Sequence, residues 1–269
     1  MKFSLGSGCS AARLLGCSAA RLLGYSAVWL FESGVMQTAA AQTRGASTTE
    51  PAMLLPGSRS LDVKHLTPQT QSMRVLVRAG SGDTTEREWS LMTRRDCVID
   101  APPGQIAHTF DYASPRTVHD SLVAQRSSLA PVFERLDLGG SLTTLRFEGN
   151  RVLGTVQRGD SMQAIERNFS HDIFAFNQLE SLVRSLDYKP GVSMVVPLFS
   201  AQDLKLEYDT LSVVEREEVN GRRAWRVRFS DAVVVSDYLI DAESRRVMAQ
   251  ETRQRSSGTR FRYEVVAGQ

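Results

Sequence analysis

Apolar and polar residues alternate along most of this chain, which is the pattern of half-buried β-strands. In residues 260–265, for example, every second side chain is aromatic or aliphatic and the others are charged. Turns rich in Gly, Asn, Asp and Ser separate such segments at intervals of roughly 8–12 residues, as in an antiparallel meander. A long meander usually curls to limit its free edges. We therefore expect a mainly β fold, an antiparallel meander curled into a barrel or half-barrel.

Turn chemistry predicts the register of two hairpins. Asn220-Gly221 is the favoured pair for a two-residue type I′ turn, and Gly149-Asn150 also tolerates positive φ. Counting outward from these turns gives the expected cross-strand pairs: Glu218 with Arg223, Glu215 with Arg226, Val214 with Val227, Phe147 with Val152, and Glu148 with Arg151.

Residues 170–191 depart from the alternation and predict the one helix of the fold. Their apolar residues return at the spacing of one helical face: Phe176, Leu179, Leu182, Val183 and Leu186. Ser170 or Asp172 can cap the start, and Pro190-Gly191 stops the helix. Its other face is polar without being rich in Lys or Arg, unlike a membrane-surface helix: Asn177, Gln178, Glu180, Ser181 and Arg184. We expect an amphipathic plug or lid over the β-structure.

The first 41 residues look like a targeting segment. Residues 22–31 have about the length of a signal-peptide apolar region, and Ala39-Ala40-Ala41 fits the small-residue cleavage rule. This run is too short to span a bilayer. We therefore predict a signal peptide over 1–41, a flexible linker over 42–71 and a single β-barrel-like domain over 72–269. The expected location is periplasmic or outer-membrane-associated, and organellar import is the alternative because the opening is Arg-bearing and acid-poor.

The net charge of +2 belongs to the leader, where Lys2, Arg13 and Arg21 outnumber Glu32. The rest of the chain is neutral, which argues against nucleic acid as a partner. Arginine is nevertheless concentrated near the end, with ten Arg against five acidic residues from Gly221 to Arg262. One interpretation is a basic face that docks an acidic partner or anionic lipid. The other is that long side chains cover and pair on the outer sheet. The candidate residues are Arg226, Arg228, Arg260 and Arg262.

Candidate chemistry is sparse. Cys97 is the one cysteine after the leader, and a small packed residue is the expected role. His108 and His119 could meet across paired strands, but no third ligand is evident. Ser161 follows Gly159-Asp160 in a hairpin turn without triad partners. We therefore predict no catalytic residue, no metal and no cofactor; an enzyme using Ser161 or the two histidines is a third hypothesis.

Residues 238–251 read Tyr-Leu-Ile-Asp-Ala-Glu-Ser-Arg-Arg-Val-Met-Ala-Gln-Glu, a strand end that turns through an acidic loop into an Arg-bearing strand. This resembles the closing signature of exported bacterial proteins of unknown function related to the outer-membrane lipoprotein carriers of the LolA and LolB type. A hairpin near Phe147, a helix after Phe169 and a Val-Pro-Leu-Phe strand at 196–199 follow the same order, so the resemblance covers roughly 115–266. It implies a barrel or half-barrel that encloses an apolar cavity, with helical material as plug or lid.

Two interpretations of the interior stay open, because barrels of this size either fill with side chains or hold an apolar ligand. The first predicts an exported, non-enzymatic protein that binds an apolar or acylated ligand, such as a lipid or acyl chain. The alternative is a structural or envelope-assembly module with a filled core that docks a protein partner through the basic face. Eight side chains are candidates for the cavity or lid: Phe174, Phe176, Leu179, Leu182, Trp225, Phe229, Phe261 and Tyr263.

Overall fold

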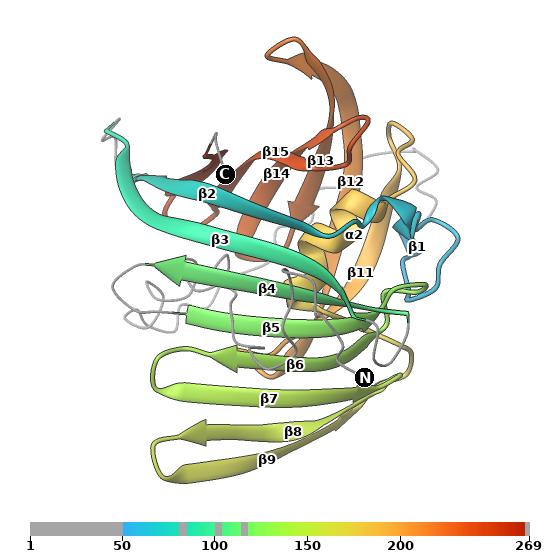
Figure 1. Ribbon diagram of the computed structural model, residues 1–269, viewed down its shortest axis with the longest axis vertical. Coiled ribbons are helices and arrows are strands. Elements are labelled where there is room, and N and C mark those ends of the chain that lie inside the picture. Colours follow the sequence, from blue (N-terminus) through green and yellow to red (C-terminus); the bar gives the residue numbers. More distant parts are fainter. Residues whose placement is uncertain (1–50, 81–84, 100–103, 114–117, 267–269) are drawn as a thin grey trace, which may run out of the picture.

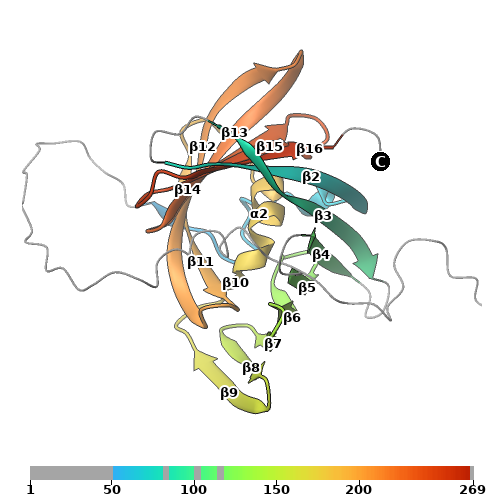
Figure 2. The same ribbon diagram turned by 90° about the vertical axis from the view of Figure 1, so that its left-hand side faces the viewer.

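The computed structural model describes residues 51–80, 85–99, 104–113 and 118–266. Within them the fold is mainly β, as predicted, and a large sheet curls around one short α-helix without closing (Figures 1 and 2). The described strands are β1 (Ala52–Met53), β2 (Gln69–Arg78), β3 (Arg87–Ile99), β4 (Gln105–Ala113), β5 (Val118–Gln125), β6 (Pro131–Asp137), β7 (Ser141–Glu148), β8 (Arg151–Arg158), β9 (Ser161–Asn168), β10 (Phe174–Ala175), β11 (Ser193–Ser200), β12 (Lys205–Val219), β13 (Arg222–Ser230), β14 (Val234–Asp241), β15 (Val247–Gln254) and β16 (Arg260–Val265). The helical elements are η1 (Val63–His65), η2 (Phe176–Gln178) and α2 (Leu179–Ser185).

Two antiparallel meanders make up the sheet. One runs from β2 to β9 and the other from β11 to β16, and in each of them every strand pairs with the next in sequence. They join where β16 pairs with β2, with Phe261 opposite Val77 and Tyr263 opposite Val75. The last strand of the chain thus lies beside the first long one, and the two meanders form one continuous sheet.

The predicted hairpin registers are confirmed with one exception. The confirmed pairs are Phe147 with Val152, Glu148 with Arg151, Glu218 with Arg223, and Glu215 with Arg226. Val227, however, lies opposite Val213 and not opposite Val214. A β-bulge between Val213 and Glu215 adds one residue to β12, which shifts the register beyond it by one position.

Side-chain packing brings the two arms of the curled sheet together. The ring of Phe199 on β11 lies edge-on to that of Phe147 on β7, with 6.4 Å between centroids. The ring of Phe169, just after β9, is 5.7 Å from the same Phe199. Figure 2 shows α2 inside the curl, between the arm of β11 and β12 and the arm of β4 to β6. The half-barrel therefore wraps around the helix.

The helix is shorter than the predicted 170–191. Residues 174–175 form β10 by parallel pairing with β11, so the α-helix begins only at Leu179. After Ser185 the chain is extended, and Leu186 forms an isolated β-bridge with Leu61. Tertiary β-pairing thus takes up both ends of the predicted helix, an effect that local spacing and capping residues do not reveal.

The segment 51–71 also differs from the predicted flexible linker. β1 pairs in parallel with β11, η1 follows, and β2 begins at Gln69 and not near residue 72. Leu54 and Leu66 are 1% and 0% exposed and belong to the main core. Burial of these two leucines fixes a stretch whose small and polar composition looks like that of a linker.

Candidate ligand-binding site

The space inside the curled sheet is filled by the protein itself. Every residue of α2 is buried, and its apolar side chains belong to the main hydrophobic core. The cavity beside the helix has a volume of about 40 Å³, and its lining includes Met92, Tyr112, Asn177, Tyr238 and Tyr263. Such a cavity has room for water but not for an acyl chain.

The eight aromatic and aliphatic candidates lie in this core or against it. Seven of them are buried: Phe174, Phe176, Leu179, Leu182, Phe229, Phe261 and Tyr263. Trp225 is partly buried and stacks on Tyr188, with 5.5 Å between ring centroids. Phe176 and Phe229 meet in a T-shaped contact at 5.9 Å. In this structure the candidates pack against one another and leave no chamber for a ligand among them.

The polar face of the helical segment is buried as well, and it packs on polar side chains of β3 to β6. Among the contacts of the helix, Glu180 forms an ion pair with Arg94, Ser181 Oγ lies 3.2 Å from His108 Nδ1, and Arg184 Nε donates to the carbonyl oxygen of Arg245 at 3.0 Å. Together with Asp120, Glu134 and Asn177, the residues Arg94, His108, Glu180 and Ser181 form what we call the buried polar row.

Two carboxyl groups of the buried polar row share one donor. Asn177 Nδ2 donates to Asp120 of β5 and to Glu134 of β6, and both acids are fully buried. Burial and the neighbouring Glu134 raise the pKa of Asp120 well above its usual value, and burial raises the pKa of Glu134 to about 8. Glu134 therefore holds its proton at pH 7. The pair can store protons, but the adjoining cavity is too small to admit a substrate.

The buried polar row was not found from the sequence, although a signal for it exists. Asp120 falls on the same strand face as Val118, Leu122 and Ala124, all of them buried. An acidic residue within an apolar strand face is costly to bury unless it has a partner or is neutral. Such a residue therefore predicts a buried polar contact, which Asn177 supplies here.

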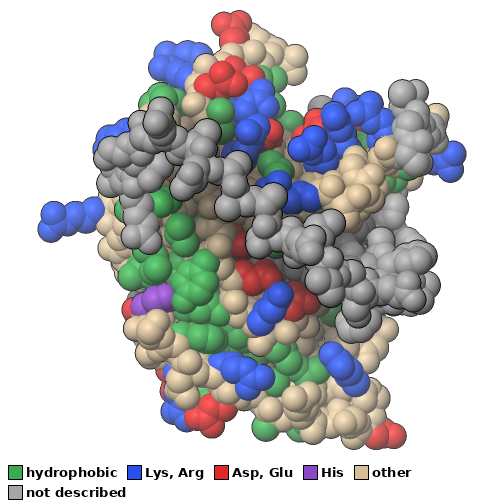
Figure 3. All heavy atoms as spheres, turned by 180° about the vertical axis from the view of Figure 1, so that it is seen from behind, with side chains coloured by type: hydrophobic (Ala, Val, Ile, Leu, Met, Phe, Trp, Pro, Cys, Tyr) green, Lys and Arg blue, Asp and Glu red, His purple; other side chains and the backbone are tan. Residues whose placement is uncertain are grey.

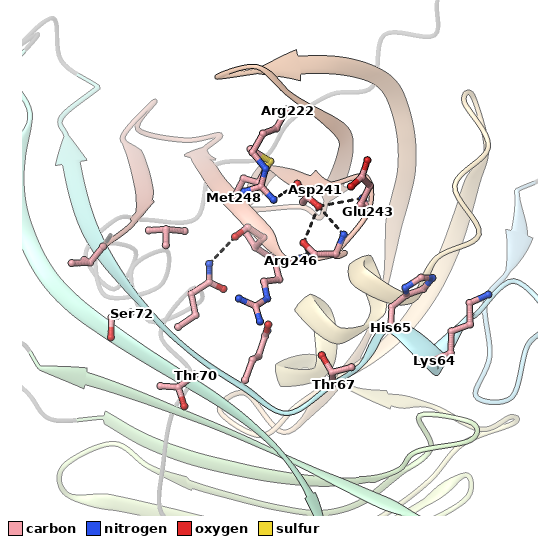
Figure 4. Close-up of a pocket in the computed structure, with 16 residues that line it drawn as sticks. Lys64, His65, Thr67, Thr70, Ser72, Arg222, Asp241, Glu243, Arg246 and Met248 are labelled. Carbon is pink, nitrogen blue, oxygen red and sulfur yellow. Dashed lines mark hydrogen bonds and ion pairs between the residues drawn. The ribbon is translucent and has the colours of Figure 1, made fainter. Parts of the chain in front are cut away.

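A larger cavity, of about 690 Å³, opens at one end of the half-barrel (Figure 4). We call it the mouth cavity. Its walls come from η1, the start of β2, the start of β13, the turn between β14 and β15, and the end of β16. It lies beyond the C-terminal end of α2, where Arg245 Nη1 donates to the carbonyl oxygen of Leu186 at 3.0 Å.

One part of the mouth cavity is aliphatic. Val247 and Met248 of β15 line it together with Val265 and Val266 at the end of β16. Val265 and Val266 are 41% and 38% exposed, whereas Val247 is buried. Gln71, on the neighbouring strand β2, holds its side chain by donating from Nε2 to the carbonyl oxygen of Val247 at 2.7 Å. The cavity thus offers exposed apolar surface beside fixed polar groups.

The other part is charged, with cations in excess. Lys64, Arg222 and Arg246 line it, against Asp241 and Glu243. Arg222 pairs with Asp241 at 2.6 Å, and Glu243 pairs with Arg223 outside the cavity at 2.8 Å.

Two neighbouring groups have shifted pKa values. Burial alone would raise the pKa of Asp241, but hydrogen bonds from Ser244 and Glu243 and the charge of Arg222 lower it below its usual value. Burial and the charge of Arg245 lower the pKa of His65, so this cavity residue is neutral at pH 7.

The four candidate residues of the basic face are all in ion pairs. Arg226 contacts Glu217 at 2.7 Å, Arg228 contacts Asp237 at 2.8 Å, Arg260 contacts Glu251 at 3.3 Å, and Arg262 contacts Glu86 at 2.5 Å. Figure 3 shows acidic and basic side chains next to one another at the end of the molecule that carries the β12–β13 hairpin. Two of the acids, Glu86 and Glu217, lie outside the stretch 221–262 in which arginine outnumbers acid, so the local excess of arginine is partly compensated.

The remaining candidates do not come together. His108 faces the helix, whereas His119 bonds Asp111 on the other face of the strand pair, with 2.9 Å from Nδ1 to the carboxylate, so the two histidines do not meet. Ser161 is exposed at the start of β9. The side chain of Cys97 lies outside the described residues. Within the described residues no group of three or more His, Cys, Asp or Glu side chains could hold a metal ion.

No protein-family model and no curated protein matches this chain. Among solved structures, it is similar to the crystal structure of a DUF1329 family protein from Desulfovibrio piger. The two chains are 8% identical, with a TM-score of 0.25, over 76% of this chain and 86% of that one. The neighbour thus belongs to a domain-of-unknown-function family, and the comparisons do not show the expected relation to LolA and LolB carriers. In the described part of the chain, no helix is long and apolar enough to cross a membrane.

Proposed function

We propose that this protein binds an apolar or acylated ligand, such as a lipid, without catalysing a reaction, and that the ligand occupies the mouth cavity. The observation that carries the proposal is the cavity of about 690 Å³, which lies within the usual range of small-molecule sites, roughly 300–1,000 Å³. Its four aliphatic side chains give an apolar segment a surface to cover.

The location differs from the one implied by the sequence. A chamber beneath the helix was expected to hold the ligand, but the cavity there has a volume of only about 40 Å³. Val265 and Val266 at the mouth are in contrast partly open to solvent. We place the protein outside the cytoplasm on the basis of the leader predicted over residues 1–41.

The test is titration of the delipidated protein with a fluorescent fatty-acyl probe, together with native mass spectrometry of the protein as purified. Val265→Asp puts a charge on the apolar wall at a residue that is 41% exposed, so the fold is expected to tolerate it. Met162→Asp, at a residue that is 67% exposed on β9 and away from the cavity, is the matched control. We expect the probe to bind, Val265→Asp to weaken binding, and Met162→Asp to leave it unchanged. Absence of probe binding and of co-purified lipid would refute the proposal.

The alternative function is a structural or envelope-assembly module. The observation that favours it is that the space enclosed by the sheet is filled by side chains. Docking through the basic face requires a partner that competes with the acids already paired to Arg226, Arg228, Arg260 and Arg262. A stable partner recovered by pull-down, and lost when these four arginines are changed to glutamate, would support the alternative.

A further inference from the structure

We propose that the ligand of the mouth cavity carries an anionic head group, of the phosphate or carboxylate type, which the guanidinium of Arg246 binds while the apolar part covers Val265 and Val266. This inference rests on the proposed function and adds to it the chemical class of the ligand.

Arg246 is the cation of the cavity that is left to bind a ligand. Its side chain is exposed and extends into the cavity (Figure 4), and it forms no ion pair with any residue in the described part of the chain. Lys64 is held by Asp62 at 2.6 Å, and Arg222 by Asp241 at 2.6 Å. A guanidinium offers a planar fork of N–H donors that matches two oxygens of a carboxylate or phosphate.

The acidic groups of the cavity are already occupied. Asp241 Oδ1 accepts hydrogen bonds from the backbone N–H of Glu243 at 3.2 Å, from the N–H of Ser244 at 2.7 Å, and from the hydroxyl of Ser244 at 2.8 Å. Its other oxygen pairs with Arg222, and Glu243 pairs with Arg223. The acidic side chains of the cavity are therefore engaged, whereas the guanidinium of Arg246 has no carboxylate partner among the described residues. A ligand that supplies acceptors and negative charge balances the site.

The backbone of the turn that carries Arg246 is ordered by its neighbours. Arg245 adopts a positive φ of 58°, and its guanidinium turns away from the cavity to lie over the ring of Tyr188, 3.9 Å from the centroid. The carboxylate of Asp241 fixes the preceding turn residues. The neighbouring arginines thus point in different directions, one toward the end of the helix and one into the cavity, and the ordered turn fixes the backbone from which Arg246 extends.

The experiment compares four probes by calorimetric titration of the full chain, each below its micelle concentration. Dodecyl phosphate and dodecanoate carry anionic heads, dodecyl maltoside has the same chain with a neutral head, and inorganic phosphate has no chain. We expect the two anionic amphiphiles to bind more tightly than dodecyl maltoside. Arg246→Gln should weaken their binding by about tenfold to a hundredfold and leave dodecyl maltoside unaffected. Arg246→Lys keeps the positive charge but not the planar fork of donors, so its affinity for the anionic amphiphiles should lie between those of the wild type and Arg246→Gln.

Arg253→Gln is the matched control, because Arg253 is an exposed arginine of β15 outside the cavity. Unchanged anionic binding in Arg246→Gln, or equal affinity for neutral and anionic amphiphiles, overturns this inference and leaves the proposed function standing. If no amphiphile binds to the wild-type protein, both fail. If inorganic phosphate binds as well as dodecyl phosphate and Val265→Asp has no effect, the anion site is supported and the apolar-ligand function is refuted.

Discussion

Replacing Glu134 by glutamine is expected to stabilise the protein at neutral and alkaline pH. Glu134 is fully buried, and burial raises its pKa from 4.5 to about 8. The native protein therefore binds a proton here that the unfolded chain has already released at pH 7. Glutamine is neutral at every pH, has nearly the same volume, and retains an oxygen to accept the hydrogen bond from Asn177.

The magnitude follows from the two pKa values. Below pH 4.5 both states are protonated, so the contribution of Glu134 to stability is fully present there. As pH rises toward 8, the unfolded chain ionises first, and the free energy of unfolding falls. A carboxyl with pKa 4.5 unfolded and about 8 folded lowers that free energy by about 3 kcal/mol between pH 4 and pH 7. This is a large share of the usual total of roughly 5–15 kcal/mol.

Urea unfolding from pH 4.5 to pH 8.5 measures the effect. The gain of Glu134→Gln over the wild type should be close to zero at the acid end and grow to about 3 kcal/mol near pH 7. Glu218→Gln, at an exposed residue of the β12–β13 hairpin, is the control and should follow the wild-type curve. Parallel curves for the wild type and Glu134→Gln would show that the pKa of Glu134 is not raised in the native protein. A loss of stability in this variant at every pH would contradict the expected gain. Either result refutes the reasoning.

Two further changes test how the interior is held. Arg94→Ala leaves Glu180 buried without its ion-pair partner and should cost about 3–5 kcal/mol of unfolding free energy, whereas Arg94→Met combined with Glu180→Met should recover much of that loss in the same urea assay. Phe199→Ala removes a fully buried ring that joins the two arms of the sheet and should cost about 3–5 kcal/mol; a loss below about 1 kcal/mol would show that this contact does not hold the curl together.

The sequence predicted most where short-range chemistry decides the structure. The Asn220-Gly221 turn and the opposite charges of Glu215 and Arg226 specify one register, and the structure has it. Counting outward from the turn gives the wrong partner at the next residue, Val214, because the alternation of apolar and polar residues does not reveal the β-bulge there. Local signals thus predict the register of a hairpin only as far as the first β-bulge, which local sequence does not reveal.

The helix shows a different limit. Its apolar spacing identified side chains that are indeed buried, but the same pattern cannot tell whether the polar face meets water or buried partners. The partners of Asn177 and Glu180 lie on β3, β5 and β6, far away in sequence. An apparently amphipathic helix in a long meander can therefore be buried on all sides when several strands each contribute one polar residue to the face that surrounds it.

The charge balance in a sequence window failed for a related reason. Counting from Gly221 to Arg262 leaves out Glu86 and Glu217, which the pairing of distant strands brings beside two of the arginines. The count also treats Arg245 and Arg246 alike, although the first contacts the ring of Tyr188 and the second faces the mouth cavity. Composition gives the sum of charges, and only topology shows which of them remain available.

The filled interior and the open mouth cavity are connected through Arg184 and Arg245. Buried ion pairs contribute little net stability, but they permit few positions of the helix, because any shift leaves a charge unpaired. Arg184 and Arg245 extend this restraint to the turn after β14, through hydrogen bonds to the carbonyl oxygens of Arg245 and Leu186. The contacts that exclude a ligand from the interior thus also hold the turn that presents Arg246 to the cavity, so a protein of this fold can keep a solid core and still have a preformed site at its end.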